Sequence, residues 1–172
     1  MPKTLTSDRF TLRPLAKVDT SWLARFWSLP EVNRNTATIP ANVNEDFADN
    51  RVVNAMEGEE AQTNIVRLIE CENERAGVVS LGRSSPRDAY SLGYSLHPEF
   101  WGKGIATEAC QMLLNWTDQF VYPKYYVSGH FTDNPASGTV LRKLGFLPCW
   151  RGPVHSIARD ETVDHLYMSR LI

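Results

Sequence analysis

A short glycine-rich segment between a predicted strand and a predicted helix constrains the fold of this chain more than any other feature. Residues 90–97 alternate in polarity and are closed by Pro98, which predicts a strand. Residues 105–120 carry an apolar stripe at helical spacing, which predicts a helix. Between them, Gly102 and Gly104 permit a tight turn. Such a turn exposes the first N–H groups of the helix and predicts a phosphate-binding site.

An ordinary strand-to-helix turn that needs glycines for its geometry alone explains the spacing equally well. Two other phosphate-binding patterns are absent, because no Gly-Lys-Ser/Thr and no spaced triple-glycine fingerprint occurs. Glu108 in the first turn of the predicted helix opposes a bound anion but suits the helix dipole, so we assign it a structural role.

The remaining pattern predicts one mixed domain, residues 1–172, of the α/β (α+β) class. Further helices are expected after Asp19 and Asn44 as N-caps, the second ending near Met56 with Gly58 just beyond it, and after Asn134. With residues 105–120 this makes about four helices. About seven strands are expected at residues 9–15, 63–71, 76–82, 90–97, 124–131, 146–151 and 162–171.

Composition excludes several classes of function. The net charge of −2 provides no basic field for nucleic acid. No apolar run approaches the roughly 20 residues of a membrane span. The three cysteines and four histidines lack ligand spacing, so we expect no metal. We expect the cysteines to be reduced thiols and the protein to be cytoplasmic. We expect it to be a monomer or a homodimer.

A second motif decides the interpretation. It lies about 25 residues beyond the glycine turn and comprises Asn134-Pro135-Ala136-Ser137 followed by Lys143-Leu144-Gly145-Phe146. Together with the run from Gly93 to Ala109, it resembles the GNAT superfamily of acetyl-CoA-dependent N-acetyltransferases, in particular the branch of ribosomal-protein N-terminal alanine acetyltransferases. The opening residues 10–15 also resemble the first strand of this family.

The resemblance implies a GNAT fold whose two central strands splay apart, with acetyl-CoA as co-substrate. Backbone groups near Leu96 and His97 would pair with the pantetheine arm, and the amide of Asn134 would contact its end. The pyrophosphate would lie on the turn formed by Trp101, Gly102, Lys103, Gly104, Ile105, Ala106 and Thr107. Many family members carry Arg or Gln where Trp101 stands, so backbone N–H groups would provide most of this binding. Lys143 would add positive charge near the phosphates, although such a lysine is usually only solvated.

The resemblance also implies the catalytic roles. Ser137 would protonate the departing thiolate, with Tyr125 and Tyr126 as alternatives. His155 stands near the position of the family's proposed base, in competition with Glu161, Asp164 and a water chain. Tyr94 would line the acceptor cavity.

These residues predict an N-acetyltransferase in which a primary amine attacks directly in a ternary complex. The amine could belong to a protein N-terminus, a polyamine, an aminoglycoside or an amino-acid-like molecule. The alternative is a CoA-binding sensor or interaction module without turnover.

Overall fold

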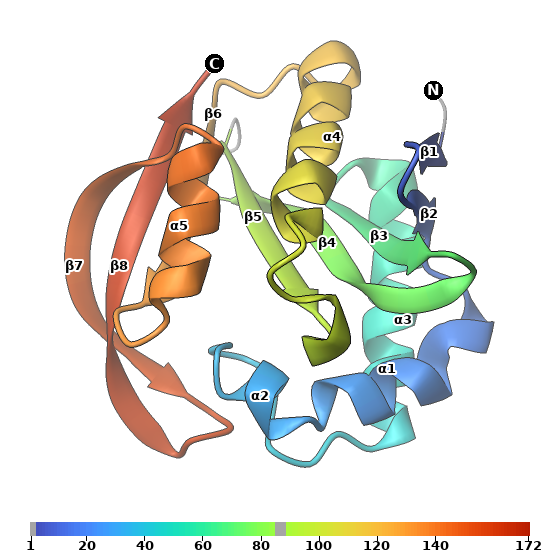
Figure 1. Ribbon diagram of the computed structural model, residues 1–172, viewed down its shortest axis with the longest axis horizontal. Helices are drawn as coiled ribbons and strands as arrows, with labels where there is room; N and C mark the ends of the chain where they lie inside the picture. Colours follow the sequence, from blue (N-terminus) through green and yellow to red (C-terminus); the bar gives the residue numbers. More distant parts are fainter. Residues whose placement is uncertain (1–2, 85–88) are drawn as a thin grey trace.

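The computed structural model describes residues 3–84 and 89–172, and within them eight strands form one sheet (Figure 1). The sheet order is β1-β2-β3-β4-β5-β6-β8-β7, and every neighbouring pair is antiparallel except β5 and β6. The strands are β1 (Leu5–Thr6), β2 (Thr11–Pro14), β3 (Asn64–Cys71), β4 (Glu74–Ser84), β5 (Ala89–Leu96), β6 (Tyr125–Phe131), β7 (Leu147–Ser156) and β8 (Glu161–Leu171).

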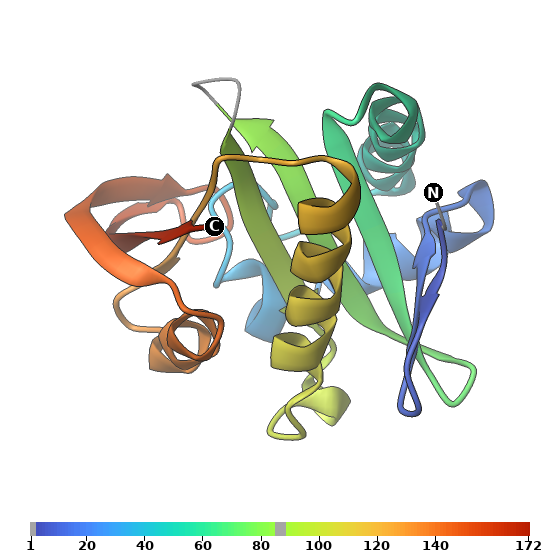
Figure 2. The same cartoon turned by 90° about the horizontal axis from the view of Figure 1, so that it is seen from above.

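Helices cover both faces of this sheet, as the view from above shows (Figure 2). One face packs against α4 in a core that includes Leu12, Ile65, Leu81 and Leu113. The opposite face packs against α1 and α3 around Leu23, Val52 and Leu68. The helices are α1 (Thr20–Trp27), α2 (Pro30–Asn33), α3 (Glu45–Ala61), α4 (Ile105–Phe120) and α5 (Pro135–Lys143), with 3₁₀ turns η1 (Lys17–Asp19) and η2 (Pro98–Phe100).

The parallel strands β5 and β6 pair only at their beginnings. Ala89, Tyr90 and Ser91 lie opposite Tyr125, Tyr126 and Val127, and the pairing stops there although both strands continue. Just beyond the last pair, the Ser128 hydroxyl donates to the carbonyl of Leu92 at 2.8 Å. The two strands therefore open a gap in the middle of the sheet, as expected for splayed central strands.

The predicted elements occur in the predicted order, and α4 has the predicted bounds. The short helix α2 (Pro30–Asn33) was not predicted, and further details differ. Gly58 lies inside α3, because the helix continues to Ala61; a Cβ there would stand 2.6 Å from the Cβ of Asn64, so the glycine permits close packing rather than ending the helix. The two-residue strand β1 was not predicted, since two residues carry no periodicity.

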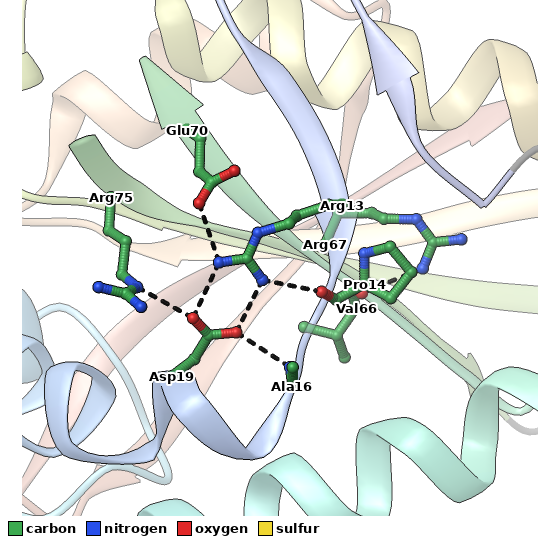
Figure 3. A network of polar contacts seen from close by, with 8 residues as sticks. All are labelled: Arg13, Pro14, Ala16, Asp19, Val66, Arg67, Glu70 and Arg75. Atoms are coloured by element: carbon green, nitrogen blue, oxygen red, sulfur yellow. Dashed lines mark hydrogen bonds and ion pairs between the residues drawn. The ribbon is translucent and has the colours of Figure 1, made fainter. Parts of the chain in front are cut away.

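The predicted N-cap Asp19 makes no capping hydrogen bond. Its fully buried carboxylate instead accepts from Arg13 at 2.8 and 2.9 Å, from Arg75 at 2.9 Å and from the N–H of Ala16 at 2.9 Å (Figure 3). Arg13 also pairs with Glu70 at 2.9 Å. This network joins the start of α1 to β2, β3 and β4, and so fixes the helix that covers one end of the candidate site.

Candidate active site

The glycine turn has the geometry of an anion site. Gly102 and Gly104 adopt φ of +73° and +78°, the left-handed region that favours glycine, and a Cβ on Gly102 would meet nothing within 4 Å. The first backbone bond of α4 joins Glu108 N–H to the carbonyl of Gly104 at 3.1 Å. The N–H groups of residues 105–107 precede that bond and lack intrahelical acceptors. The predicted phosphate contacts thus share one helix start.

Arg9, near the N-terminus of the chain, holds this turn in place. Its guanidinium donates to the carbonyl of Lys103 at 2.6 Å and to the carboxylate of Glu108 at 2.9 Å. Sequence reasoning missed Arg9, because a contact across 94 residues leaves no local pattern. The positive charge of Arg9 offsets the negative charge of the Glu108 carboxylate, which lies close to the site where a phosphate would bind.

The end of β5 presents part of the backbone predicted to pair with a ligand. The N–H of His97 donates to the carbonyl of Ala76 at 2.8 Å, so this amide faces β4 rather than the gap. Since backbone groups alternate along a strand, the N–H of Leu96 faces the gap. The carbonyl of Leu96 accepts from the indole Nε1 of Trp101 at 2.8 Å. Trp101 therefore ties the glycine turn to β5, and the Leu96 N–H is the donor left toward β6.

Ser137, in the first turn of α5 after its N-cap Asn134, contacts Tyr94 of β5. The side-chain oxygen of Asn134 accepts from the N–H of Ser137 at 3.2 Å and caps α5, while no described residue bonds its amide nitrogen. The Tyr94 hydroxyl donates to the carbonyl of Ser137 at 3.0 Å and lies 2.7 Å from Ser137 Oγ, where either hydroxyl can donate. Burial raises the pKa of Tyr94, which keeps its hydroxyl protonated.

A cavity of about 760 Å³ reaches Tyr94 and Ser137 from the face that carries α3. Its walls come from the sheet around Ser80, from Trp27, from Arg51 on α3, from the loop 35–39, and from β6 and β8. Its volume lies within the usual range of small-molecule sites. The contact between Tyr94 and Ser137 thus lies between this cavity and the face on which α4 begins.

Two histidines line the same cavity on the β6 and β8 side. His130 Nδ1 lies 2.8 Å from the carbonyl of Phe131 and must donate to it, because a carbonyl only accepts. Its Nε2 is buried without a partner among the described residues, against Gly138, where a Cβ would stand 2.5 Å away. The pKa of His165 is lowered by burial and by His130, against a smaller opposing effect of Asp164.

Several predicted residues lie away from this cavity. His155 and Val154 are neighbours on β7, and Val154 lines the cavity; since successive side chains of a strand point to opposite faces, His155 points away from it. The side chain of His155 is 56% exposed. Asp164 pairs with Arg151 at 3.1 Å, and Glu161 lies 3.7 Å from Arg159. None of the three predicted bases, His155, Asp164 and Glu161, has a contact with Ser137 among the described residues.

The other predicted residues lie on the periphery. Lys103 and Lys143 are exposed, and Lys103 lies 5.4 Å from the ring centre of Phe100. Tyr125 and Tyr126 stand where β5 and β6 are still paired. The hydroxyl of Tyr126 donates to Asp118 at 2.6 Å.

Comparison with known proteins agrees with this geometry. A family model described as acetyltransferase (GNAT) domain matches residues 9–147. The chain belongs to the GNAT acetyltransferase family. A curated relative, the uncharacterized N-acetyltransferase p20 of Bacillus licheniformis, is 28% identical over 116 residues, which cover 66% of this chain and 65% of the relative.

Solved structures of the family share the fold. The microcin C7 self-immunity acetyltransferase MccE, in complex with acetyl-CoA and AMP, superposes with a TM-score of 0.85 at 22% identity, covering 100% of this chain and 98% of its own. The ribosomal-protein N-terminal acetyltransferase RimL, in complex with coenzyme A, gives 0.87 at 20% identity, with 98% and 97% covered. The ribosomal-protein-S5-alanine acetyltransferase of Vibrio fischeri gives 0.83 at 18% identity, with 98% and 96% covered.

Two features are absent from the described residues, 3–84 and 89–172. These residues contain no cluster of three or more His, Cys, Asp or Glu side chains that could hold a metal ion. They also contain no helix long and apolar enough to cross a membrane.

Proposed function

We propose that this GNAT protein is an acetyl-CoA-dependent N-acetyltransferase that acts on a primary amine. The observation that carries the proposal is the contact between Tyr94 and Ser137, which lies between the acceptor cavity and the glycine turn. The acetyltransferases MccE and RimL, which share this fold and were solved with acetyl-CoA and with coenzyme A, support the same reaction.

The residues of the turn and of the gap fit the coenzyme. The N–H groups of residues 105–107 and the left-handed glycines suit its pyrophosphate, with Lys103 and Lys143 as further positive charges. The Leu96 N–H and the free amide of Asn134 suit the amides of the pantetheine arm. The expected contact from the backbone of His97 is not supported, because its N–H donates to the carbonyl of Ala76 and its carbonyl accepts from the N–H of Phe100. Acetyl-CoA supplies the thioester acyl group.

Ser137 acts as the general acid for the leaving sulfur, and Tyr94 assists it. As the amine nitrogen bonds to the acyl carbon and the carbon–sulfur bond breaks, Ser137 Oγ donates a proton to the sulfur. Tyr94, whose hydroxyl stays protonated and lies 2.7 Å away, turns its O–H to the serine oxygen and stabilises it by a hydrogen bond, and the serine regains its proton from water before the next turnover. The nitrogen proton must leave to the opposite side, into the acceptor cavity.

His165 is our proposed acceptor for that second proton. It lines the cavity, and its lowered pKa keeps the ring neutral near pH 7. His130 is less suited, because it is buried with its Nε2 enclosed against Gly138, whereas His165 is only partly buried. His155, the residue expected from the sequence, points away from the cavity, so its role as base stays a prediction without a supporting contact.

The test is thiol release from acetyl-CoA in the presence of a panel of amines. Ser137→Ala should lower kcat roughly 100-fold or more. Tyr94→Phe should lower it about tenfold, the effect of one hydrogen bond. Because Tyr94 acts through Ser137, the double variant should be no slower than Ser137→Ala alone. Tyr125→Phe, at the closed end of the gap, is the matched control and should leave kcat unchanged.

The alternative of a CoA-binding sensor makes the opposite prediction. Calorimetry would then detect acetyl-CoA binding, whereas no amine of the panel would release thiol. Wild-type turnover by Ser137→Ala at saturating substrates would remove the serine from the mechanism.

A further inference from the structure

The charge distribution of the acceptor cavity restricts the amines that it can hold. Among its described lining residues there is no Asp and no Glu, and the one Lys or Arg side chain is Arg51 on α3. The other polar groups of the wall are neutral, such as Asn35, Thr38 and Ser80. An ammonium group that leaves water needs an opposite charge, and this lining offers none.

One wall of the cavity is aromatic. His165 stacks obliquely on Tyr167 with ring centres 4.4 Å apart and meets Phe131 edge-on at 5.7 Å. Trp150 on β7 backs Tyr167 at 4.9 Å. Trp27 of α1 lines the cavity as well, together with aliphatic side chains such as Val78. Such a wall favours an acceptor whose body is apolar or aromatic.

Arg51 sets the preference at the α3 side of the cavity. Its guanidinium lies 5.1 Å from the ring centre of Phe47, and its contacts with Thr38 are long, at 3.2 and 3.4 Å. No carboxylate of the described residues pairs with it. Guanidinium groups bind carboxylate and phosphate through paired N–H donors. An acidic group on the acceptor would provide the partner that Arg51 lacks.

We propose that the acceptor carries a single amine on an apolar body with an acidic group remote from that amine, as in a short neutral peptide acid, and that polyamines and aminoglycosides are not acceptors. The inference rests on the proposed acetyl transfer and narrows its substrate class. The amine lies at Tyr94 and Ser137, the body lies along the aromatic wall, and the acidic group lies toward Arg51.

The experiment compares three acceptors with the intact protein and acetyl-CoA: alanyl-phenylalanine, its C-terminal amide, and spermidine. The dipeptide acid should have a KM about tenfold below that of the amide, and spermidine should give a kcat/KM at least 100-fold below that of the acid. Arg51→Gln should raise the KM of the acid to that of the amide without changing kcat. Arg25→Gln, an exposed arginine of α1 outside this cavity, is the matched control and should change neither.

Equal KM values for the acid and the amide would overturn the role of Arg51. Spermidine turnover that equals or exceeds that of the dipeptide would overturn the substrate class, while leaving N-acetyl transfer itself supported. Failure of every amine to release thiol, with acetyl-CoA bound, would instead overturn the proposed function. Thermal denaturation of Arg51→Gln and Arg25→Gln checks that both variants remain folded.

Discussion

Two tyrosines at opposite ends of the gap between β5 and β6 differ in what their hydroxyls can do. Tyr94 lies at the open end and shares its hydroxyl with Ser137. Tyr126 lies at the closed end, fully buried, and bonds to Asp118. Burial raises the pKa of Tyr126 as it does that of Tyr94. Both hydroxyls stay protonated, so location rather than acidity distinguishes them as proton donors.

At the scale of single residues, the pH dependence of kcat/KM should identify the base. The titratable groups that influence the pKa of His165 are His130 on β6, which lowers it, and Asp164, its neighbour on β8, which raises it and is paired with Arg151 on β7. Because the folded pKa of His165 lies below its ordinary value of 6.5, activity should fall as the pH drops through that lowered pKa.

His165→Gln should remove this ionisation and lower kcat/KM roughly 100-fold. The acceptor amine titrates in the same way with every variant, so it does not account for a difference between their pH profiles. His155→Gln serves as the control and should keep the wild-type profile; loss of the ionisation in this variant would return the role of base to His155.

At the scale of elements, the turn between η2 and α4 couples β5 to the helix start. The indole of Trp101 holds the turn to the end of β5, and Arg9 holds it to the first turn of α4. The left-handed glycines orient the N–H groups between these two attachments. Coenzyme affinity should therefore depend on backbone conformation more than on any one side chain of the turn.

Gly104→Val tests this dependence. The φ of +78° is strained for a β-branched residue, although a Cβ would meet only Arg9 Nη1 at 4.0 Å. We expect the Kd for acetyl-CoA to rise at least tenfold, about 1.4 kcal/mol. Gly82→Ala is the control and should leave the Kd unchanged, since its Cβ would have only Asn64 Oδ1 within 4 Å, at 4.0 Å. Unchanged affinity of a folded Gly104→Val protein in calorimetry would contradict the assignment of the phosphate site.

At the scale of the whole molecule, ion pairs hold the outer parts of the fold to the central sheet. The Asp19 network fixes α1 on three strands (Figure 3). On the other side, Arg159 joins the β7–β8 turn to Asp133 at 2.6 Å and to the carbonyl of Arg34 at 2.6 Å. These contacts link both flanks of the cavity that reaches Tyr94 and Ser137, so its shape depends on segments far apart in the chain.

Removing the charge of Asp19 should destabilise this arrangement. Burial alone would raise its pKa, but hydrogen bonds from Arg13, Ala16 and Arg75 outweigh burial and hold the pKa below 3.8. Its stabilising contribution is therefore complete above the unfolded pKa and is lost as the pH falls through the lower, folded one. Asp19→Asn should reduce the free energy of unfolding by about 3 kcal/mol at pH 7, as measured with urea.

The control for this variant is Glu57→Gln, an exposed position on α3, which should change stability by less than about 0.5 kcal/mol. Wild-type stability of Asp19→Asn would show that the network adds nothing to the fold.

Local sequence determined the elements of this protein and much of the turn proposed to bind the coenzyme. Hydrophobic periodicity, capping residues and glycines act within a few residues of the chain. This is why α4, the left-handed turn and the Asn134 cap were predictable. Tertiary structure alone decided which side chains meet. Tyr94 and Ser137 are 43 residues apart, and Arg9 reaches its partners across more than 90. The face on which His155 lies depends on strand register, which shifts between Pro148 and Trp150 in β7. A shift of one residue exchanges the two faces of a strand, so only the folded sheet could place His165 rather than His155 at the cavity.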